Sequence, residues 1–137
     1  MVIIGRRKDA IEKVALELNI TGMMADQSHL GDIEKLTSDI LAQFRKMDLL
    51  LINTEITKSA PIESISQQVF DEIKDVNFNG AYFTLGRFIA IQNEGASVIF
   101  LSSTSATISP PMASVYASSK AAFITGVIFF IYGRQSL

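Results

Sequence analysis

The sequence predicts an α/β fold built on a doubly wound parallel sheet. Short apolar runs that end at glycine or at a polar residue alternate along the chain with segments whose apolar residues recur at helical spacing. One of these runs, "DLLLIN", is continuously apolar rather than alternating, as expected for a parallel strand covered by helices on both faces. The length of 137 residues fits one domain, so we expect a single unit over residues 1–137.

The first half of the chain is predicted to contain three strands separated by two helices. The strands are residues 1–5, 22–26 and 48–53, and the helices are residues 6–19 and 31–44. Apolar residues recur along one side of each helix: Ile11, Val14, Ala15 and Leu18 in the first, and Ile33, Leu36, Ile40 and Phe44 in the second. The strands at residues 22–26 and 48–53 are expected to be buried.

The second half is predicted to contain a long helix, a buried strand and a last helix. The long helix covers residues 67–92, the strand begins near residue 96, and the last helix begins near residue 115 and runs toward residue 132. The run "AAFITGVIFFIYG" is shorter than the roughly 20 residues that span a bilayer. We therefore expect a buried or interface helix there, with Phe129, Phe130 and Tyr132 available for contacts between chains.

Composition excludes several classes of function. Acidic and basic residues are interleaved at a net charge of −2, and no basic stripe indicates nucleic-acid binding. The sequence has no cysteine, and its single histidine, His29, is interpreted as a solvated loop residue, so no metal site is predicted. The apolar run at residues 2–4 is too short for a signal peptide. These features predict a soluble, cytoplasmic protein without a membrane or nucleic-acid partner.

Polar residues follow four of the predicted strands. Arg6, Asp26, Asn53 and Ser103 each end or follow a strand. Ligands bind beyond the carboxyl ends of the strands in open α/β sheets, so these residues are candidates for a site.

Tyr116 and Lys120, in "SVYASSK", are spaced so that both project from one side of the last helix. A phenol has an unperturbed pKa of about 10, and a nearby cation favours the phenolate. We therefore expect Lys120 to lower the pKa of Tyr116 and to make it a general acid–base group. Ser103 could hydrogen-bond a substrate carbonyl. By itself, the Tyr–Lys pair would more often be structural than functional.

The segment "VIFLSSTSATISPPMASVYASSKAAF" resembles the active-site region of the short-chain dehydrogenase/reductase family. The signature of that family is a serine thirteen residues before YxxxK, as Ser103 is here. The resemblance implies a Rossmann-like fold and an oxidoreductase that transfers hydride to or from a carbonyl or secondary alcohol. It also implies that Ser103 binds the carbonyl, that Tyr116 donates the proton, and that Lys120 holds the nicotinamide ribose.

Two further segments extend the resemblance. "DVNFNG" resembles the motif whose asparagine, here Asn77, joins the catalytic residues through a helix distortion and a water. "ADQS" resembles the segment whose aspartate, here Asp26, hydrogen-bonds the adenine amine. The alternative interpretations are an ordinary polar helix residue for Asn77 and a helix N-cap or turn residue for Asp26.

The segment "IIGRR" indicates the type of nucleotide. Sites that prefer NAD usually place an acidic residue on the ribose 2′-hydroxyl. Here Gly5 is followed by Arg6 and Arg7, and the planar guanidinium group suits a 2′-phosphate. The chain is therefore expected to favour NADP(H) over NAD(H), with Arg6 the stronger candidate. The alternative is a solvated helix start.

The sequence departs from the family in three places. It begins at the family's second strand, without the glycine-rich turn that holds the pyrophosphate. If the chain folds alone, the strands at residues 1–5 and 48–53 must pair directly, or a partner must supply the missing strand. The family's NNAG reads "INTE" here, so only Asn53 matches, and Glu55 replaces a glycine. The resemblance fades after about Gly126, so the C-terminal strands and the substrate-selecting residues are missing.

The resemblance implies a homo-oligomer formed through the long helix and the Tyr116–Lys120 helix. The expected function is NADP-linked oxidoreduction, with Asn77, Ser103, Tyr116 and Lys120 as the catalytic residues. One alternative is a truncated, catalytically inactive relative that acts only through protein association. Another is an unrelated flavodoxin-like binding domain, against which the ordered match of motifs argues.

Overall fold

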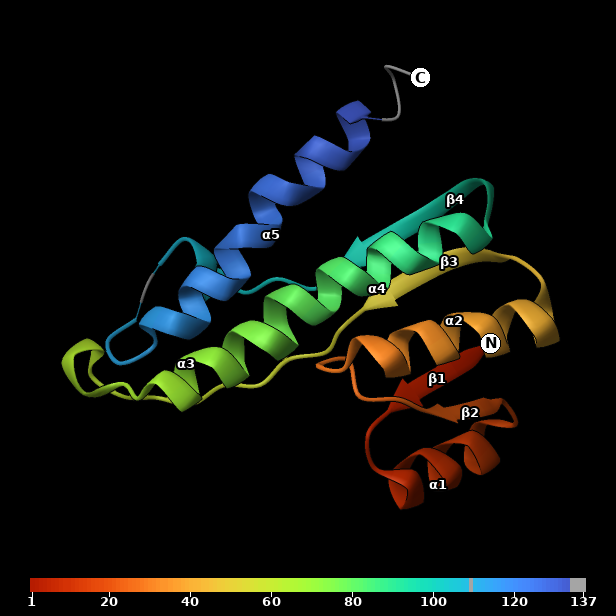
Figure 1. Ribbon diagram of the computed structural model, residues 1–137, viewed down its shortest axis with the longest axis horizontal. Coiled ribbons are helices and arrows are strands. Elements are labelled where there is room, and N and C mark those ends of the chain that lie inside the picture. The colour runs from red at the N-terminus through yellow and green to blue at the C-terminus, as the bar shows by residue number, and fades with distance from the viewer. Residues whose placement is uncertain (109, 134–137) are drawn as a thin grey trace.

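The chain alternates strands and helices in the predicted order (Figure 1). The structure is a computed structural model that describes residues 1–108 and 110–133, with side chains described up to residue 124. The strands are β1 (Val2–Gly5), β2 (Thr21–Met24), β3 (Met47–Ile52) and β4 (Gln92–Phe100). The helices are α1 (Lys8–Leu18), α2 (Leu30–Phe44), α3 (Gln67–Lys74), α4 (Ala81–Phe88) and α5 (Ser114–Gly133). The α/β prediction is therefore confirmed.

The strands form two parallel pairs. β1 pairs with β2 from Val2 opposite Thr21 to Gly5 opposite Met24, and β3 pairs with β4 so that Ile52 lies opposite Phe100. Among the described residues, β1 and β3 belong to different sheets and are not paired. Direct pairing of these two strands, one of the two arrangements that the sequence left open, is therefore not formed.

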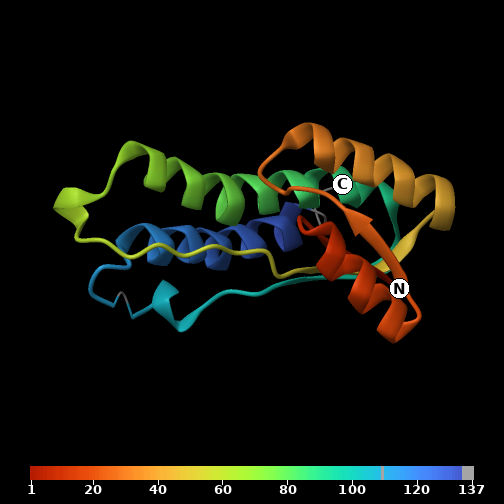
Figure 2. The same cartoon turned by 90° about the horizontal axis from the view of Figure 1, so that it is seen from below.

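Helices cover the two strand pairs unequally. α2 and the long helix that contains α4 lie on one side of the strands, whereas α1 lies on the opposite side against β1 and β2 (Figure 2). Beside α1 the backbone approaches closely, because a Cβ on Gly22 would lie under 3.0 Å from Ile11. The main core fills the space between α2, β3, α4 and α5, and its centre is the fully buried Phe88.

Several strand residues that were expected to be buried are exposed. Leu50 and Ile52 are each 6% exposed and face α2 and α4, but Leu49 and Leu51, on the other face of β3, are 56% and 53% exposed. The expectation that helices cover both faces of residues 48–53 is thus wrong for this chain, because α1 covers only β1 and β2. Other apolar side chains in or next to the strands and at the helix ends are also exposed: Met24, Ile99, Leu101, Leu18 and Phe44.

α5 confirms the predicted last helix and runs from Ser114 to Gly133. The side chains of Phe129, Phe130 and Tyr132, to which contacts between chains were assigned, lie outside the described residues. Within the described part of the chain, no helix has both the length and the apolar character required to cross a bilayer.

The predicted long helix is interrupted by a π-helical turn. α3 is capped by Ser66, whose hydroxyl accepts from the Val69 amide, and it continues into a π turn over Asp75–Gly80 before α4 begins. The turn contains the "DVNFNG" motif, so the expected helix distortion is confirmed. A π turn adds a residue to the helical repeat and changes the direction in which the following side chains point.

Gly80 permits close contact between the end of this turn and the loop after β2. A Cβ on Gly80 would lie under 3.0 Å from the backbone carbonyl of Gln27, an atom that cannot move aside as a flexible side chain can. We predict that Gly80→Ala lowers the free energy of unfolding by about 1–3 kcal/mol. Urea denaturation followed by circular dichroism would measure the loss.

Gly86→Ala is the matched control, because Gly86 lies in α4 with nothing within 4 Å of its Cβ position. Alanine favours helix there, so this change should raise the free energy of unfolding by up to about 1 kcal/mol. Equal effects of the two substitutions would contradict the role assigned to Gly80.

Candidate active site

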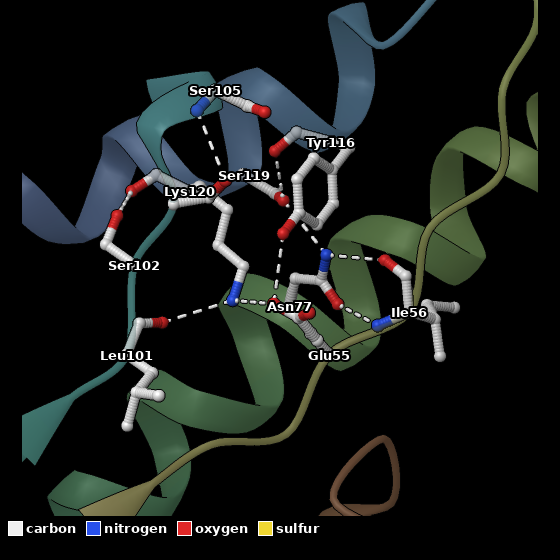
Figure 3. Close-up of polar contacts among 10 residues, drawn as sticks. Glu55, Ile56, Asn77, Leu101, Ser102, Ser105, Tyr116, Ser119 and Lys120 are labelled. Carbon is white, nitrogen blue, oxygen red and sulfur yellow. Dashed lines mark hydrogen bonds and ion pairs between the residues drawn. The ribbon is translucent and has the colours of Figure 1, made fainter. Parts of the chain in front are cut away.

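The residues predicted to be catalytic lie beyond the carboxyl ends of β3 and β4, where Figure 3 shows Asn77, Tyr116 and Lys120 close together. The π turn contributes Asn77, the segment after β4 contributes Ser103, and the first two turns of α5 contribute Tyr116 and Lys120. The loop after β3 brings in Glu55, which was not among the predicted site residues. Four segments that are distant in the sequence therefore converge on one site.

Glu55 is bonded to both functional groups of the YxxxK motif. Its Oε2 atom lies 2.6 Å from Lys120 Nζ and accepts a hydrogen bond of 3.0 Å from Tyr116 Oη. Lys120 Nζ also donates to the carbonyl of Leu101 at 3.1 Å and lies 5.8 Å from the centre of the Tyr116 ring. The Lys120 side chain is only 4% exposed, so Glu55 is the counter-ion of a buried cation.

The pKa of Tyr116 is raised above its ordinary value of 10.0. Burial of the phenol is the largest cause, a hydrogen bond with Ser103 acts in the opposite direction, and the hydrogen bond and negative charge of Glu55 raise the pKa further. The expected lowering of this pKa is therefore not found, because burial and Glu55 together outweigh the hydrogen bond with Ser103. A neutral phenol is the form present at neutral pH.

The pKa of Glu55 is held below its ordinary value of 4.5. The hydrogen bond from Lys120 is the largest cause, burial opposes it, and the hydrogen bond from Tyr116 and the charge of Lys120 add to the lowering. Glu55 is therefore an anion at neutral pH and keeps its two hydrogen bonds across the physiological range.

Asn77 connects three segments of the site. It is 2% exposed, its side-chain oxygen accepts from the Ile56 amide at 2.8 Å, and its amide group donates to the Ile56 carbonyl at 2.9 Å. The amide group also donates to the Ser119 hydroxyl at 3.1 Å, and that hydroxyl donates to the Tyr116 carbonyl at 2.7 Å. Asn77 thus ties the loop after β3 to the helix that contains Tyr116 and Lys120.

Ser103 precedes a short 3₁₀ helix, Thr104–Ala106, and its hydroxyl accepts from the Ser105 amide at 3.1 Å. The same side chain is close enough to Tyr116 to influence its pKa through a hydrogen bond. The adjacent Ser102 hydroxyl donates to the Lys120 carbonyl at 3.2 Å and joins this segment to α5. Serine and phenol hydroxyls therefore lie side by side, where one carbonyl oxygen could accept from both.

The residues predicted to bind the adenosine end lie at a second place, beyond β1 and β2. Arg6 Nη1 is 3.9 Å from Asp26 Oδ2, and both residues line an open pocket of about 320 Å³ together with six others: Ser28, His29, Ile56, Glu72, Asp75 and Val76. Arg6 is half exposed, so its guanidinium group is accessible from the pocket. Arg7 is the exposed residue before α1, and Asn53 is exposed directly after β3.

Asp26 is a turn residue, which was the alternative to its predicted role in binding adenine. Its Oδ1 atom accepts from the backbone amide of Ser28 at 2.9 Å and from the Ser28 hydroxyl at 2.7 Å. Burial raises the pKa of Asp26, but these bonds, with Arg6 and His29, outweigh burial and lower it. His29 is exposed and precedes α2, in agreement with its interpretation as a solvated residue. No cluster of metal-binding side chains occurs in the searched part of the chain, residues 1–108 and 110–133.

Sequence reasoning missed Glu55, Ile56 and Ser119 as parts of the site. One signal was available for Glu55, which stands where the family pattern has glycine, although only its effect on a cofactor was considered. Ile56 takes part through its backbone and Ser119 through a contact across 42 positions, and neither leaves a pattern in the sequence.

One cation at each of the two places could hold part of a nicotinamide dinucleotide. The buried ammonium group of Lys120 could hold ribose hydroxyls once a ligand replaces Glu55, and the accessible guanidinium group of Arg6 suits a phosphate. The described residues contain no glycine-rich turn that could hold the pyrophosphate.

The family assignment rests on a match over most of the chain. The sequence model of the family described as "short chain dehydrogenase" matches residues 1–127. The chain belongs to this family. The predicted resemblance is thereby confirmed.

Curated relatives support the assignment. The chain is 30% identical over 132 residues to "11-beta-hydroxysteroid dehydrogenase-like 3" of Arabidopsis thaliana, covering 90% of this chain and 43% of that protein. It is 25% identical over 127 residues to "Sepiapterin reductase" of Chlorobaculum tepidum, covering 88% and 52%, respectively. The chain therefore spans about half the length of the curated relatives it matches.

Solved structures confirm the fold. An alcohol dehydrogenase from the archaeon Thermococcus sibiricus, complexed with 5-hydroxy-NADP, matches with a TM-score of 0.92 at 22% identity over 99% of this chain and 61% of that chain. A short-chain dehydrogenase/reductase from Brucella melitensis matches with a TM-score of 0.87 at 21% identity, over 90% and 55%. The arrangement of strands and helices is thus that of dehydrogenases of this family.

The lowered pKa of Glu55 predicts how stability depends on pH. A carboxyl group whose pKa is lower in the folded state contributes stability that is complete above the unfolded value and is lost as the pH falls through the folded value. The contribution of Glu55 should therefore be present above pH 4.5 and disappear on further acidification. Glu55→Gln should reduce the loss of unfolding free energy between pH 7 and acid, measured by urea titrations at several pH values.

Glu94→Gln is the control, because Glu94 is exposed in β4 at the end where Asn93 bonds to Asp48, the end opposite the site. It should leave the acid dependence unchanged. An unchanged acid dependence in Glu55→Gln would contradict the ion pair with Lys120.

Proposed function

We propose that this chain is the nucleotide-binding and catalytic part of an NADP-linked oxidoreductase that acts on a carbonyl or a secondary alcohol. The observation that carries the proposal is the meeting of Ser103, Tyr116, Lys120 and Asn77 at one end of β3 and β4. Membership in the short-chain dehydrogenase family supports it. The relatives' names include both dehydrogenases and reductases, so the direction of reaction stays open.

The proton chemistry belongs to Tyr116 and Ser103. A substrate carbonyl oxygen accepts hydrogen bonds from both hydroxyls, which polarises the carbonyl and prepares it for hydride attack. The nicotinamide cofactor, when bound, supplies the hydride. Tyr116 Oη gives its proton to the oxygen of the developing alcohol and takes one back in the reverse direction. The raised pKa of Tyr116 keeps the proton available for reduction at neutral pH.

Lys120 and Asn77 support this proton transfer. Lys120 is proposed to hold the hydroxyls of the nicotinamide ribose, and its charge stabilises the phenolate left after proton transfer. Asn77 keeps the loop after β3 and the start of α5 in fixed relation through its bonds to Ile56 and Ser119. The reacting groups are thus positioned by elements of regular structure.

The nucleotide preference is proposed to come from Arg6. Its half-exposed guanidinium group at the pocket beyond β1 can bind a 2′-phosphate with two parallel hydrogen bonds. Arg7 adds positive charge at the same strand end. Asp26 is proposed to accept from the adenine amine, and Asn53 to lie along the nucleotide between the two places.

Association with a second copy and a cytoplasmic location complete the proposal. Tyr82 and Phe83 of α4 are 46% and 39% exposed, which is consistent with contacts between copies through the long helix and α5.

Tyr116→Phe should lower the turnover of NADPH-linked carbonyl reduction at least about a hundredfold, because it removes the proton donor. The measurement is loss of NADPH absorbance with a panel of ketones and aldehydes. Lys13→Ala, at an exposed position of α1 remote from the site, should leave turnover unchanged. Full activity in Tyr116→Phe would contradict the assignment. No turnover by the unaltered chain despite nucleotide binding would favour the inactive relative that acts through association.

Arg6→Ala should weaken NADPH binding by roughly ten- to a hundredfold and leave NADH binding almost unchanged, because only NADPH has the 2′-phosphate. Arg7→Ala should weaken NADPH binding less, and the remote Lys13→Ala should have little effect. Nucleotide fluorescence titration would measure all three. Equal losses for NADPH and NADH in Arg6→Ala would contradict recognition of the 2′-phosphate.

A further inference from the structure

Glu55 lies within the site but takes no part in the reaction proposed above. It is the third residue after β3, in a loop that Asn77 fixes through the next residue, Ile56. Its side chain is 47% exposed, whereas that of its partner Lys120 is 4% exposed. The partly exposed carboxylate of Glu55 therefore reaches the buried ammonium group of Lys120, and Figure 3 shows the contact.

One carboxylate oxygen of Glu55 serves both functional groups. Oε2 accepts from Tyr116 Oη and pairs with Lys120 Nζ. A phenol has a single O–H, and here that hydrogen is directed to Glu55 rather than to a substrate. Lys120 has three N–H donors, of which Glu55 and the Leu101 carbonyl each take one. The Tyr116 hydroxyl and the Lys120 ammonium group therefore already have hydrogen-bond acceptors within the protein.

We propose that the carboxylate of Glu55 competes with the nucleotide for the ammonium group of Lys120. A ligand with a vicinal diol, such as the ribose of the nucleotide, must displace this carboxylate before Tyr116 can donate its proton to a substrate. The inference rests on the proposed function for the identity of that ligand. The contacts of Glu55 with Tyr116 and Lys120, called the bridge below, are present in the structure and do not depend on the proposed function.

Displacing Glu55 from Lys120 costs free energy, because the ion pair between them is lost. Ribose hydroxyls offer Lys120 hydrogen-bond acceptors but no negative charge, so they replace the hydrogen bond of Glu55 without replacing its ion pair. Among the described residues packed around the phenol, the charged groups are Glu55 from the loop after β3 and Lys120 from α5 itself, and Ser103 is neutral. Removing the carboxylate charge should therefore change both nucleotide affinity and the titration of Tyr116.

The first test is the titration of Tyr116, followed by ultraviolet absorbance at alkaline pH. Glu55→Gln should lower the pKa of Tyr116, because the negative charge that disfavours the phenolate is gone and the charge of Lys120 is no longer paired. Tyr116→Phe, in both backgrounds, identifies which transition belongs to Tyr116, and Glu94→Gln is the control for loss of a carboxylate. An unchanged transition in Glu55→Gln would overturn the bridge.

The second test is nucleotide affinity, measured by NADPH fluorescence titration. Glu55→Gln should bind NADPH roughly tenfold more tightly than the unaltered chain, the effect of losing one charged competitor. Equal or weaker binding would overturn the competition. Absence of NADPH and NADH binding from the unaltered chain and from Glu55→Gln would overturn the proposed function and the competition together, and the tyrosine titration would then decide the bridge alone.

A measurement on the unaltered chain covers the case in which Glu55→Gln fails to fold. With ¹³C-labelled glutamate, the carboxyl resonance of Glu55 should titrate below its ordinary pKa in the free protein and move toward that pKa when NADPH is saturating. An ordinary pKa in the free protein would overturn the bridge, and an unchanged low pKa with NADPH bound would overturn the displacement.

Discussion

The site depends on the hydrogen bonds of one buried amide, that of Asn77. Its side chain holds the backbone of Ile56 on one side and the Ser119 hydroxyl on the other, so the loop after β3 and the start of α5 cannot move independently. An unpaired amide at 2% exposure would be costly, which makes the three bonds mutually dependent. The π turn over Asp75–Gly80 places Asn77 there, and Gly80 lets that turn approach the loop after β2.

The same constraint determines the electrostatics. Because Ile56 is fixed by Asn77, the adjacent Glu55 is fixed over α5, where it neutralises the buried Lys120 and accepts from Tyr116. Burial and Glu55 raise the pKa of Tyr116, although the spacing of Tyr116 and Lys120 on the helix would allow the lysine to lower it. The geometry of a proton donor and a cation is therefore present, but in the free protein the two are joined through a carboxylate.

The helices, the strands and the motif residues could be predicted from the sequence. The packing of helices over each face of a strand and the contacts between distant residues could not. Strand and helix order, the distortion around Asn77 and the convergence of Ser103, Tyr116 and Lys120 follow from local patterns and a family signature. The exposure of Leu49 and Leu51 could not be predicted, because an apolar run shows that a strand can be buried on both faces but not which helices reach it. The contact of Glu55 with Tyr116 spans 61 positions, and no periodicity encodes such a distance.

A nucleotide site beside the Tyr116–Lys120 pair should recognise the 2′-phosphate of NADPH through Arg6. Thermal unfolding of the chain with NADPH, with NADH and without nucleotide tests it most directly, because a ligand that binds only the folded state raises the midpoint by mass action. We expect one cooperative transition whose midpoint is raised by NADPH and raised less by NADH. A transition that neither nucleotide shifts would contradict it.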